Sequence, residues 1–311
     1  MRPTDQGPPE LVADEVVRAV GTDSGSRAVA AVLAALDLDR LDGAEDTFVG
    51  GNLPHPVGRV FGGQVLAQVL LAAGRTVPTD RQVHSLHGCF LRPGDPDVPI
   101  QLAVERLRDG RSFTSRRVDA LQNGVPILSA IASFQVDQPG LENAAPMPAL
   151  VPSPQNTPTA ADVLAHLDHP IARFWSQETA FDVRHVGGSL YVDRHEHATG
   201  RQLVWMRARA PLPDHQLLHR ALLAFACDQV MLEPVLRRSG LTWSQPGLSV
   251  ASLDHAMWWH RPARADEWLL YVQSSPSAHG GRGLGMARVF TEDGALVASI
   301  AQEGMFRVPP D

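Results

Sequence analysis

Three polar side chains in the second half of the chain have the chemistry needed to direct a water molecule. Asp228 lies in the apolar run LLAFACDQVMLEP, Ser252 in SVASLDHAMWWHRP and Gln302 in ALVASIAQEGMFRV. A carboxylate accepts a proton from water, while a hydroxyl and an amide each offer a donor and an acceptor that fix its orientation. Together these residue types are suited to orienting a water molecule and accepting its proton.

Sequence patterning predicts the elements that carry these side chains. Side chains alternate in an extended strand, so Gln302 falls into the apolar row of a strand expected over 295–308. A long helix is expected over 214–236, where Asp228 emerges from an apolar stripe at helical spacing. Because aspartate is a poor residue inside a helix, its place there indicates a function.

Two residues next to Ser252 bear on the choice of chemistry. Alternation along a strand places Ser252 and Asp254 on one face and His255 on the other. Adjacent residues on opposite faces make a poor pair for moving protons at carbon, so we interpret His255 and His260 as packing residues. Ser252 is not expected to be a covalent nucleophile, since no G-x-S-x-G turn surrounds it.

The same order of elements occurs twice in the chain. Each copy has a long apolar helix, expected over 62–75 and 214–236, followed by a meander of strands with Asn-Gly or Asp-Gly turns. The segment SRRVDALQNGVPILSAIAS (115–133) aligns with GMARVFTEDGALVASIAQE (285–303) without a gap. A helix followed by an antiparallel meander is α+β, and two such sheets, side by side and each curled around its helix, form a double hotdog.

A proline-rich stretch, DQPGLENAAPMPALVPSPQNTPT, separates the copies, because proline disfavours helix interiors and central strands. We therefore expect an N-terminal tail with a short helix over 1–45, a first hotdog over 46–136 and a linker over 137–160. The second hotdog, over 161–311, carries the catalytic residues. Within it, LYVDRHE (190–196) is expected to form the first strand.

Differences between the copies single out the second one. Gln302 aligns with Ala132, and the helix of the first copy contains no acidic residue to match Asp228. The segment HSLHGCFLRP aligns with ASLDHAMWWHRP with two extra residues in the later copy, so that Ser85 matches Ser252. Serine alone therefore does not mark the active copy.

Composition excludes several classes of protein. The 311 residues are 44% hydrophobic, and a net charge of −7 gives no reason to expect nucleic-acid binding. No apolar run reaches the roughly 18 residues of a membrane helix. The start, MRPTDQGPPELVADE, lacks the order of a secretory signal. Cys89 and Cys227 are expected to be buried thiols, and the chain to be cytoplasmic.

Several segments together resemble the acyl-CoA thioesterase II family. They are FGGQVLAQVLLAA, VHSLHGCFLRPGD, RDGRSFTSRRV, ASLDHAMWWHRP, EWLLYVQSSPSAHGGRGLGMARVF and VASIAQEGMFRV, and the likeness spans about residues 46–308. The resemblance implies the double hotdog fold and hydrolysis of acyl-CoA to a fatty acid and CoA without a cofactor. Its catalytic Asp, Ser/Thr and Gln map onto Asp228, Ser252 and Gln302.

Other residues are candidates for substrate binding. The Gly62-Gly63 pair before the first helix would let the acyl group approach backbone N–H groups that stabilise an oxyanion. Arg282 is a candidate contact for the CoA phosphates. The two histidines of DRHEHATG (193–200) lack further ligands, so no metal site is expected.

Two other functions remain open at this point. A hotdog hydratase or dehydratase would need Asp254 and His255 to act on an acyl thioester, and a non-catalytic module would only bind acyl-CoA. Curled sheets with exposed edges often associate, so we expect a homodimer or homotetramer. The sequence does not predict the preferred acyl chain length.

Overall fold

The computed structural model describes residues 23–55, 58–164, 166–168, 170–191 and 199–308. The first half contains helices α2 (Ser24–Leu36) and α3 (Gly62–Gly74) and strands β1 (Asp39–Arg40), β2 (Thr47–Gly50), β3 (Arg81–Phe90), β4 (Ile100–Asp109), β5 (Phe113–Gln122) and β6 (Val125–Val136). The second half contains strands β7 (Phe181–Val186), β8 (Arg201–Ala208), β9 (Ser249–Ser252), β10 (Asp254–Trp259), β11 (Leu269–His279), β12 (Arg282–Thr291) and β13 (Leu296–Arg307). Its main helices are α6 (Gln216–Cys227) and α7 (Glu233–Arg238).

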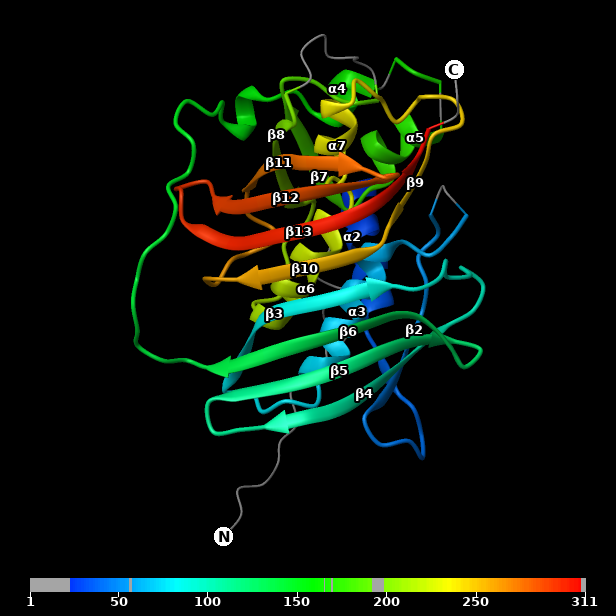
Figure 1. Ribbon diagram of the computed structural model, residues 1–311, viewed down its shortest axis with the longest axis vertical. Coiled ribbons are helices and arrows are strands. Elements are labelled where there is room, and N and C mark those ends of the chain that lie inside the picture. Colours follow the sequence, from blue (N-terminus) through cyan, green and yellow to red (C-terminus); the bar gives the residue numbers. More distant parts are fainter. Residues whose placement is uncertain (1–22, 56–57, 165, 169, 192–198, 309–311) are drawn as a thin grey trace.

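The strands form one antiparallel sheet in which the two copies lie side by side (Figure 1). Its order is β1-β2-β4-β5-β6-β3-β10-β13-β12-β11-β8-β7, and β9 pairs with β13 beside this path. The copies meet where β3 pairs with β10, from Asp254 opposite Cys89 to Trp258 opposite Ser85. Helices α3 and α6 lie together on one face of the sheet, which confirms the α+β double hotdog.

The segment between the copies runs along one side of the molecule, from the end of β6 toward the second half (Figure 1). It contains no helix or strand from Asp137 to Ser153, where prolines interrupt regular structure. Short helical segments follow, namely η1 (Pro154–Asn156), α4 (Ala160–Leu164), α5 (Pro170–Arg173) and the π-helical η2 (Phe174–Glu178).

The expected first strand of the second copy is wrong. Strand β7 begins at Phe181 and pairs with β8 up to Val186, whereas Leu190 and Tyr191 lie in a turn. The rest of that predicted strand and most of DRHEHATG lie outside the described residues. The segment FDVRHV also alternates, and its apolar Phe181 and Val183 are buried against the core, which decides between the two segments.

The expected single helix over 214–236 is in fact two helices. Helix α6 ends at Cys227 with Asp228 as its C-cap, and a turn leads to α7. Pro234 explains the break, because it has no N–H to donate to the carbonyl of Val230. That carbonyl instead accepts from Glu233 N at 3.2 Å and from the amide of Gln273 at 3.0 Å. Asp228 is therefore at a helix end, where its side chain is free to turn toward the sheet.

The two copies share one apolar core beneath the sheet. It includes most of α3 and α6 together with inward-facing residues of strands from both halves. Gly63 lets the helices approach, since a Cβ at that position would lie 2.4 Å from the carbonyl oxygen of Phe225. Cys227 is buried as expected, but Cys89 is exposed, because it lies on a strand face that no helix covers. No helix among the described residues is long and apolar enough to cross a membrane.

Candidate active site

Asp228, Ser252 and Gln302 meet at the inner face of the second hotdog, as the sequence predicts. The amide nitrogen of Gln302 lies 2.7 Å from Asp228 Oδ1 and 2.8 Å from Ser252 Oγ. Ser252 Oγ lies 3.3 Å from the same carboxylate oxygen. The three groups therefore form a closed triangle of hydrogen bonds, drawn from a helix end, a short strand and the last strand.

Glycines in strands β12 and β13 allow the chain that follows Asp228 to lie close to the sheet. Gly285 of β12 pairs with Gln302, and a Cβ on it would lie 2.0 Å from the carbonyl oxygen of Met231. Gly304, two residues beyond Gln302, would likewise place a Cβ 2.5 Å from the side chain of Leu232. The turn that follows Asp228 thus rests directly on the backbone of β12 and β13.

The hydrogen bonds determine which atoms of the three side chains are left without a partner inside the triangle. Both amide hydrogens of Gln302 are used, one on Asp228 and one on Ser252, so the Ser252 hydroxyl hydrogen is left to donate to Asp228. Asp228 Oδ1 therefore accepts two hydrogen bonds. Asp228 Oδ2 points the other way, toward Gly62, where a Cβ would lie 2.8 Å from it. Gln302 is fully buried, so it holds Asp228 and Ser252 rather than touching the cavity itself.

His255 lies inside the site, contrary to the prediction from alternation. The strand breaks at Leu253, between β9 and β10, so Ser252 and His255 both reach Gln302. Asp254 faces the opposite way and accepts from the backbone N–H of Glu303 at 2.9 Å. His255 Nδ1 lies 2.7 Å from Gln302 Oε1, and burial lowers the pKa of His255. Nothing in the sequence pattern marks the break, so alternation alone misplaced this residue.

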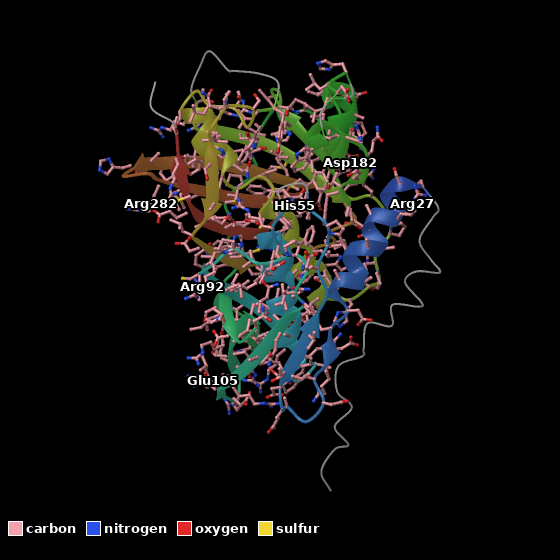
Figure 2. All side chains as sticks on the ribbon, turned by 90° about the vertical axis from the view of Figure 1, so that its right-hand side faces the viewer. Arg27, His55, Arg92, Glu105, Asp182 and Arg282 are labelled. Atoms are coloured by element: carbon pink, nitrogen blue, oxygen red, sulfur yellow. The ribbon has the colours of Figure 1, made fainter. Side chains whose placement is uncertain are left out.

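A cavity of about 960 Å³ opens beside the triangle, between the two hotdogs and helix α2. Asp228, Ser252 and Gly62 line it. Its walls are rich in aromatic side chains, including Phe61, Phe90, Phe174, Trp175, Tyr191 and Phe225. Three exposed arginines, Arg59, Arg92 and Arg173, also line it. The cavity therefore combines largely apolar walls with exposed arginines. Figure 2 labels two of its lining residues, His55 near the middle of the molecule and Arg92 at one side.

Of the other predicted binding residues, Gly62 lies at the cavity and Arg282 does not. Gly62 and Gly63 form the start of α3, where backbone N–H groups have no partner within the helix, and Gly62 faces the cavity. Arg282 does not line the cavity. Its Nε lies 3.2 Å from Glu303 Oε1 at the exposed end of β12 (Figure 2).

Register shows that the first copy lacks all three groups. Gln302 corresponds to Ala132, and both are buried on the inner face. Ser252 pairs with Gly304, and the matching pair in the first copy is Val83 with Phe134. The alignment of Ser252 with Ser85 is therefore wrong by two residues, because both copies have an irregularity at the same place, between Val83 and Ser85 in β3 and at Leu253 between β9 and β10.

The C-cap of α3 is Arg75, as Asp228 is the C-cap of α6, and Thr76 follows it. The described residues contain no cluster of three side chains suited to a metal ion.

Comparison with known proteins identifies the family. Residues 176–305 match the model of the family described as acyl-CoA thioesterase, and residues 52–135 match its N-terminal domain. The chain is 36% identical to human acyl-coenzyme A thioesterase 8, over 90% of this chain and 89% of that protein. It is also 36% identical to acyl-CoA thioesterase 2 of Haemophilus influenzae, over 88% and 95% respectively.

Solved structures agree with this assignment. An acyl-CoA thioesterase II from Mycobacterium marinum is 43% identical, with a TM-score of 0.74 over 89% of this chain and 98% of that one. A protein of unknown function with a hot dog fold from Alicyclobacillus acidocaldarius shares the fold, with a TM-score of 0.72 at 22% identity. The chain belongs to the acyl-CoA thioesterase II family.

Proposed function

We propose that this enzyme hydrolyses acyl-CoA thioesters with a water held by Asp228 and Ser252 in the second hotdog. Asp228 Oδ2 accepts a proton from the water, whose oxygen attacks the carbonyl carbon. The tetrahedral intermediate collapses, the C–S bond breaks, and a fatty acid and CoA thiol leave, with the proton returned from Asp228. The observation that carries this proposal is the hydrogen-bonded triangle, which leaves one carboxylate oxygen facing the cavity.

The cavity supports acyl-CoA as the substrate. Its aromatic walls suit an acyl chain, and Arg59, Arg92 and Arg173 at its rim suit the phosphates of CoA. The N–H groups of Gly62 and Gly63 are the donors for the oxyanion, since they begin a helix and Gly62 lies against Asp228. Arg282 stays outside this proposal because it pairs with Glu303 away from the cavity.

The hydratase alternative has no support in the geometry of the second hotdog. Asp254 and His255 point to opposite sides of the strand and do not form a pair. We further propose a cytoplasmic location, favoured by the two unpaired cysteines, and a homodimer or homotetramer.

An assay of free thiol release tests the proposal. The protein is incubated with acyl-CoA of increasing chain length, and thiol is followed with a thiol reagent. We expect turnover that falls by about 10²–10⁴ in Asp228→Asn, which cannot accept the proton. Thr76→Val, near the matching place in the first copy, is the control and should retain wild-type turnover.

Other outcomes would replace the proposal. Hydration of an enoyl-CoA without thiol release would indicate the hydratase reaction. Binding of acyl-CoA without turnover would indicate a binding module.

A further inference from the structure

A buried imidazole that the proposed mechanism does not use lies directly behind the active site. His255 is 1% exposed and contacts Gln302 Oε1 through Nδ1 at 2.7 Å and Cys227 Sγ through Nε2 at 3.7 Å. It reaches neither the cavity nor Asp228 by a hydrogen bond in the described structure. Its hydrogen bond toward Asp228 and Ser252 therefore runs through the amide of Gln302.

The hydrogen bonds of the Gln302 amide determine which ring nitrogen of His255 carries the hydrogen. The atom of Gln302 that lies 2.7 Å from the Asp228 carboxylate must be the nitrogen, because a carbonyl oxygen there would face like charge. Its other amide hydrogen goes to Ser252 Oγ. The carbonyl Oε1 can only accept, so His255 must present Nδ1–H to it. Burial keeps the imidazole neutral by lowering the pKa of His255, which leaves Nε2 as an acceptor facing the thiol of Cys227.

We propose that His255 is a positioning residue that holds the Gln302 amide in the one orientation that donates to both Asp228 and Ser252. Rotation of the amide would turn its oxygen toward the carboxylate and release the Ser252 hydroxyl. The base and the hydroxyl would then lose their fixed relation to the water. This inference rests on the proposed thioesterase reaction.

Substitutions that keep or remove the Nδ1–H donor test the role. His255→Leu removes the donor, His255→Asn replaces it with an amide N–H near the Nδ1 position, and His255→Gln carries the same amide one bond farther out. We expect kcat to fall roughly 10- to 100-fold in His255→Leu and His255→Gln, with KM within about threefold. His255→Asn should recover most of the lost kcat. Folded His255→Asn that is as slow as His255→Leu would overturn the proposal.

A double-mutant cycle separates positioning from general structural damage. In a Gln302→Ala background, His255→Leu and His255→Asn should cause no further fall in kcat beyond about twofold, because the group through which His255 acts is already missing. A full additive loss would overturn the proposal. If His255→Leu fails to fold, the pair of Asn and Gln variants gives the same comparison.

A readout independent of activity distinguishes this inference from the proposed function. In ¹⁵N-histidine spectra of the whole protein at pH 7, His255 should be the neutral Nδ1–H tautomer. An Nε2–H tautomer would refute the positioning role even in an active enzyme. Absence of thiol release from a protein with the expected tautomer would instead refute the proposed reaction.

Discussion

The two hotdogs differ most at the inner face beside the end of each central helix. In the second copy, three inward positions of β12 and β13 are glycines, namely Gly283, Gly285 and Gly304. Register places Thr114, Arg116 and Phe134 at the matching positions of the first copy, since Gly283 pairs with Gly304 as Thr114 pairs with Phe134. The gap-free alignment of 115–133 with 285–303 is therefore wrong by one residue along β5 and β12, because the turn after β12 is one residue longer. The glycines accommodate the turn after Asp228 and helix α7, whereas the larger side chains fill that space themselves.

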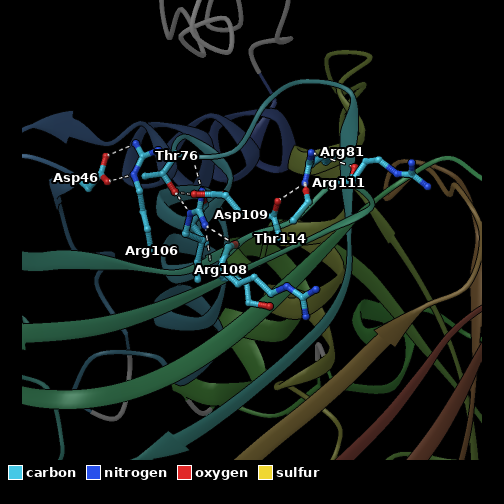
Figure 3. Close-up of polar contacts among 12 residues, drawn as sticks. Asp46, Thr76, Arg81, Arg106, Arg108, Asp109, Arg111 and Thr114 are labelled. Carbon is cyan, nitrogen blue, oxygen red and sulfur yellow. Dashed lines mark hydrogen bonds and ion pairs between the residues drawn. The ribbon is translucent and has the colours of Figure 1, made fainter.

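In the first copy a side chain, that of Arg116, therefore fills the space that the backbone of the turn after Asp228 fills in the second copy. Arg116 is completely buried, and its guanidinium donates to Thr76 Oγ1 at 2.8 Å, to the carbonyl of Thr76 at 3.0 Å and to Asp109 at 2.6 Å. Figure 3 shows Thr76 and Asp109 in this cluster, beside the Asp46–Arg106 ion pair. The same sheet geometry thus holds the Asp228 carboxylate beside a cavity in one copy and a buried Arg116 hydrogen-bonded to Thr76 in the other.

Adding a methyl group at Gly285 should have the largest effect, because this glycine is one of the differences between the two copies. Gly285→Ala directs a Cβ at the carbonyl of Met231 and must displace the turn that positions Asp228. We expect kcat to fall about 100-fold and the free energy of unfolding to fall by about 1–3 kcal/mol. Kinetics and denaturant unfolding measure both.

Gly140→Ala is the control for Gly285→Ala, since a Cβ at Gly140 meets nothing within 4 Å. Wild-type kcat in Gly285→Ala would show that the close approach of the turn is not needed for catalysis.

Removing the plug of the first copy should affect stability and not turnover. Arg116→Met keeps the apolar stem but leaves the buried oxygens of Thr76 without their donor. We expect the free energy of unfolding to fall by about 1–3 kcal/mol, while kcat stays within about twofold of wild type. Urea denaturation and the thiol assay test the two halves of this expectation. A large loss of kcat at unchanged stability would mean that the first copy takes part in the reaction.

The two central helices should also differ, by a smaller effect, in how their buried polar residues make the free energy of unfolding depend on pH. His219 in α6 is fully buried and accepts from Ala265 N at 3.1 Å, and burial lowers its pKa. The unfolded chain then binds a proton more readily than the folded one, so stability is lost as pH falls from about 6.5 toward the lower folded pKa. His219→Asn should reduce the difference in unfolding free energy between pH 7 and pH 5.5, by at most about 1.4 kcal/mol.

Helix α3 offers the control for His219→Asn, because its buried polar side chains Gln64 and Gln68 do not titrate. Gln68→Leu should change stability equally at both pH values. An unchanged pH dependence in His219→Asn would contradict the assignment of the effect to that imidazole.

The sequence predicts the repeat well because the repeat depends on local patterns. Alternation and turn dipeptides locate β5, β6, β12 and β13, and the mismatch between Gln302 and Ala132 singles out the copy in which Asp228, Ser252 and Gln302 meet. Pro234 is a local signal that 214–236 is not one continuous helix, because a proline lacks the N–H of a helix interior and is suited to a first turn, where it lies in α7.

The remaining features depend on contacts between distant segments. No local signal marks the strand break at Leu253, which turns His255 toward Gln302. The first copy has the same irregularity between Val83 and Ser85, so that Ser252 matches Val83 rather than Ser85. The function of Gly285 likewise emerges only when the register of β12 brings it under Met231.

The pairing of β3 with β10 also determines which strand edges of the sheet are left for contacts with other molecules. Strands β3 and β10 pair their backbone N–H and C=O groups with each other. In the described part of the chain the order of the sheet therefore ends at β1 and β7, of two and six residues. Short terminal strands give a foreign chain little unpaired backbone on which to extend the sheet. Extension of the sheet by strands of a second copy is therefore disfavoured at these two ends.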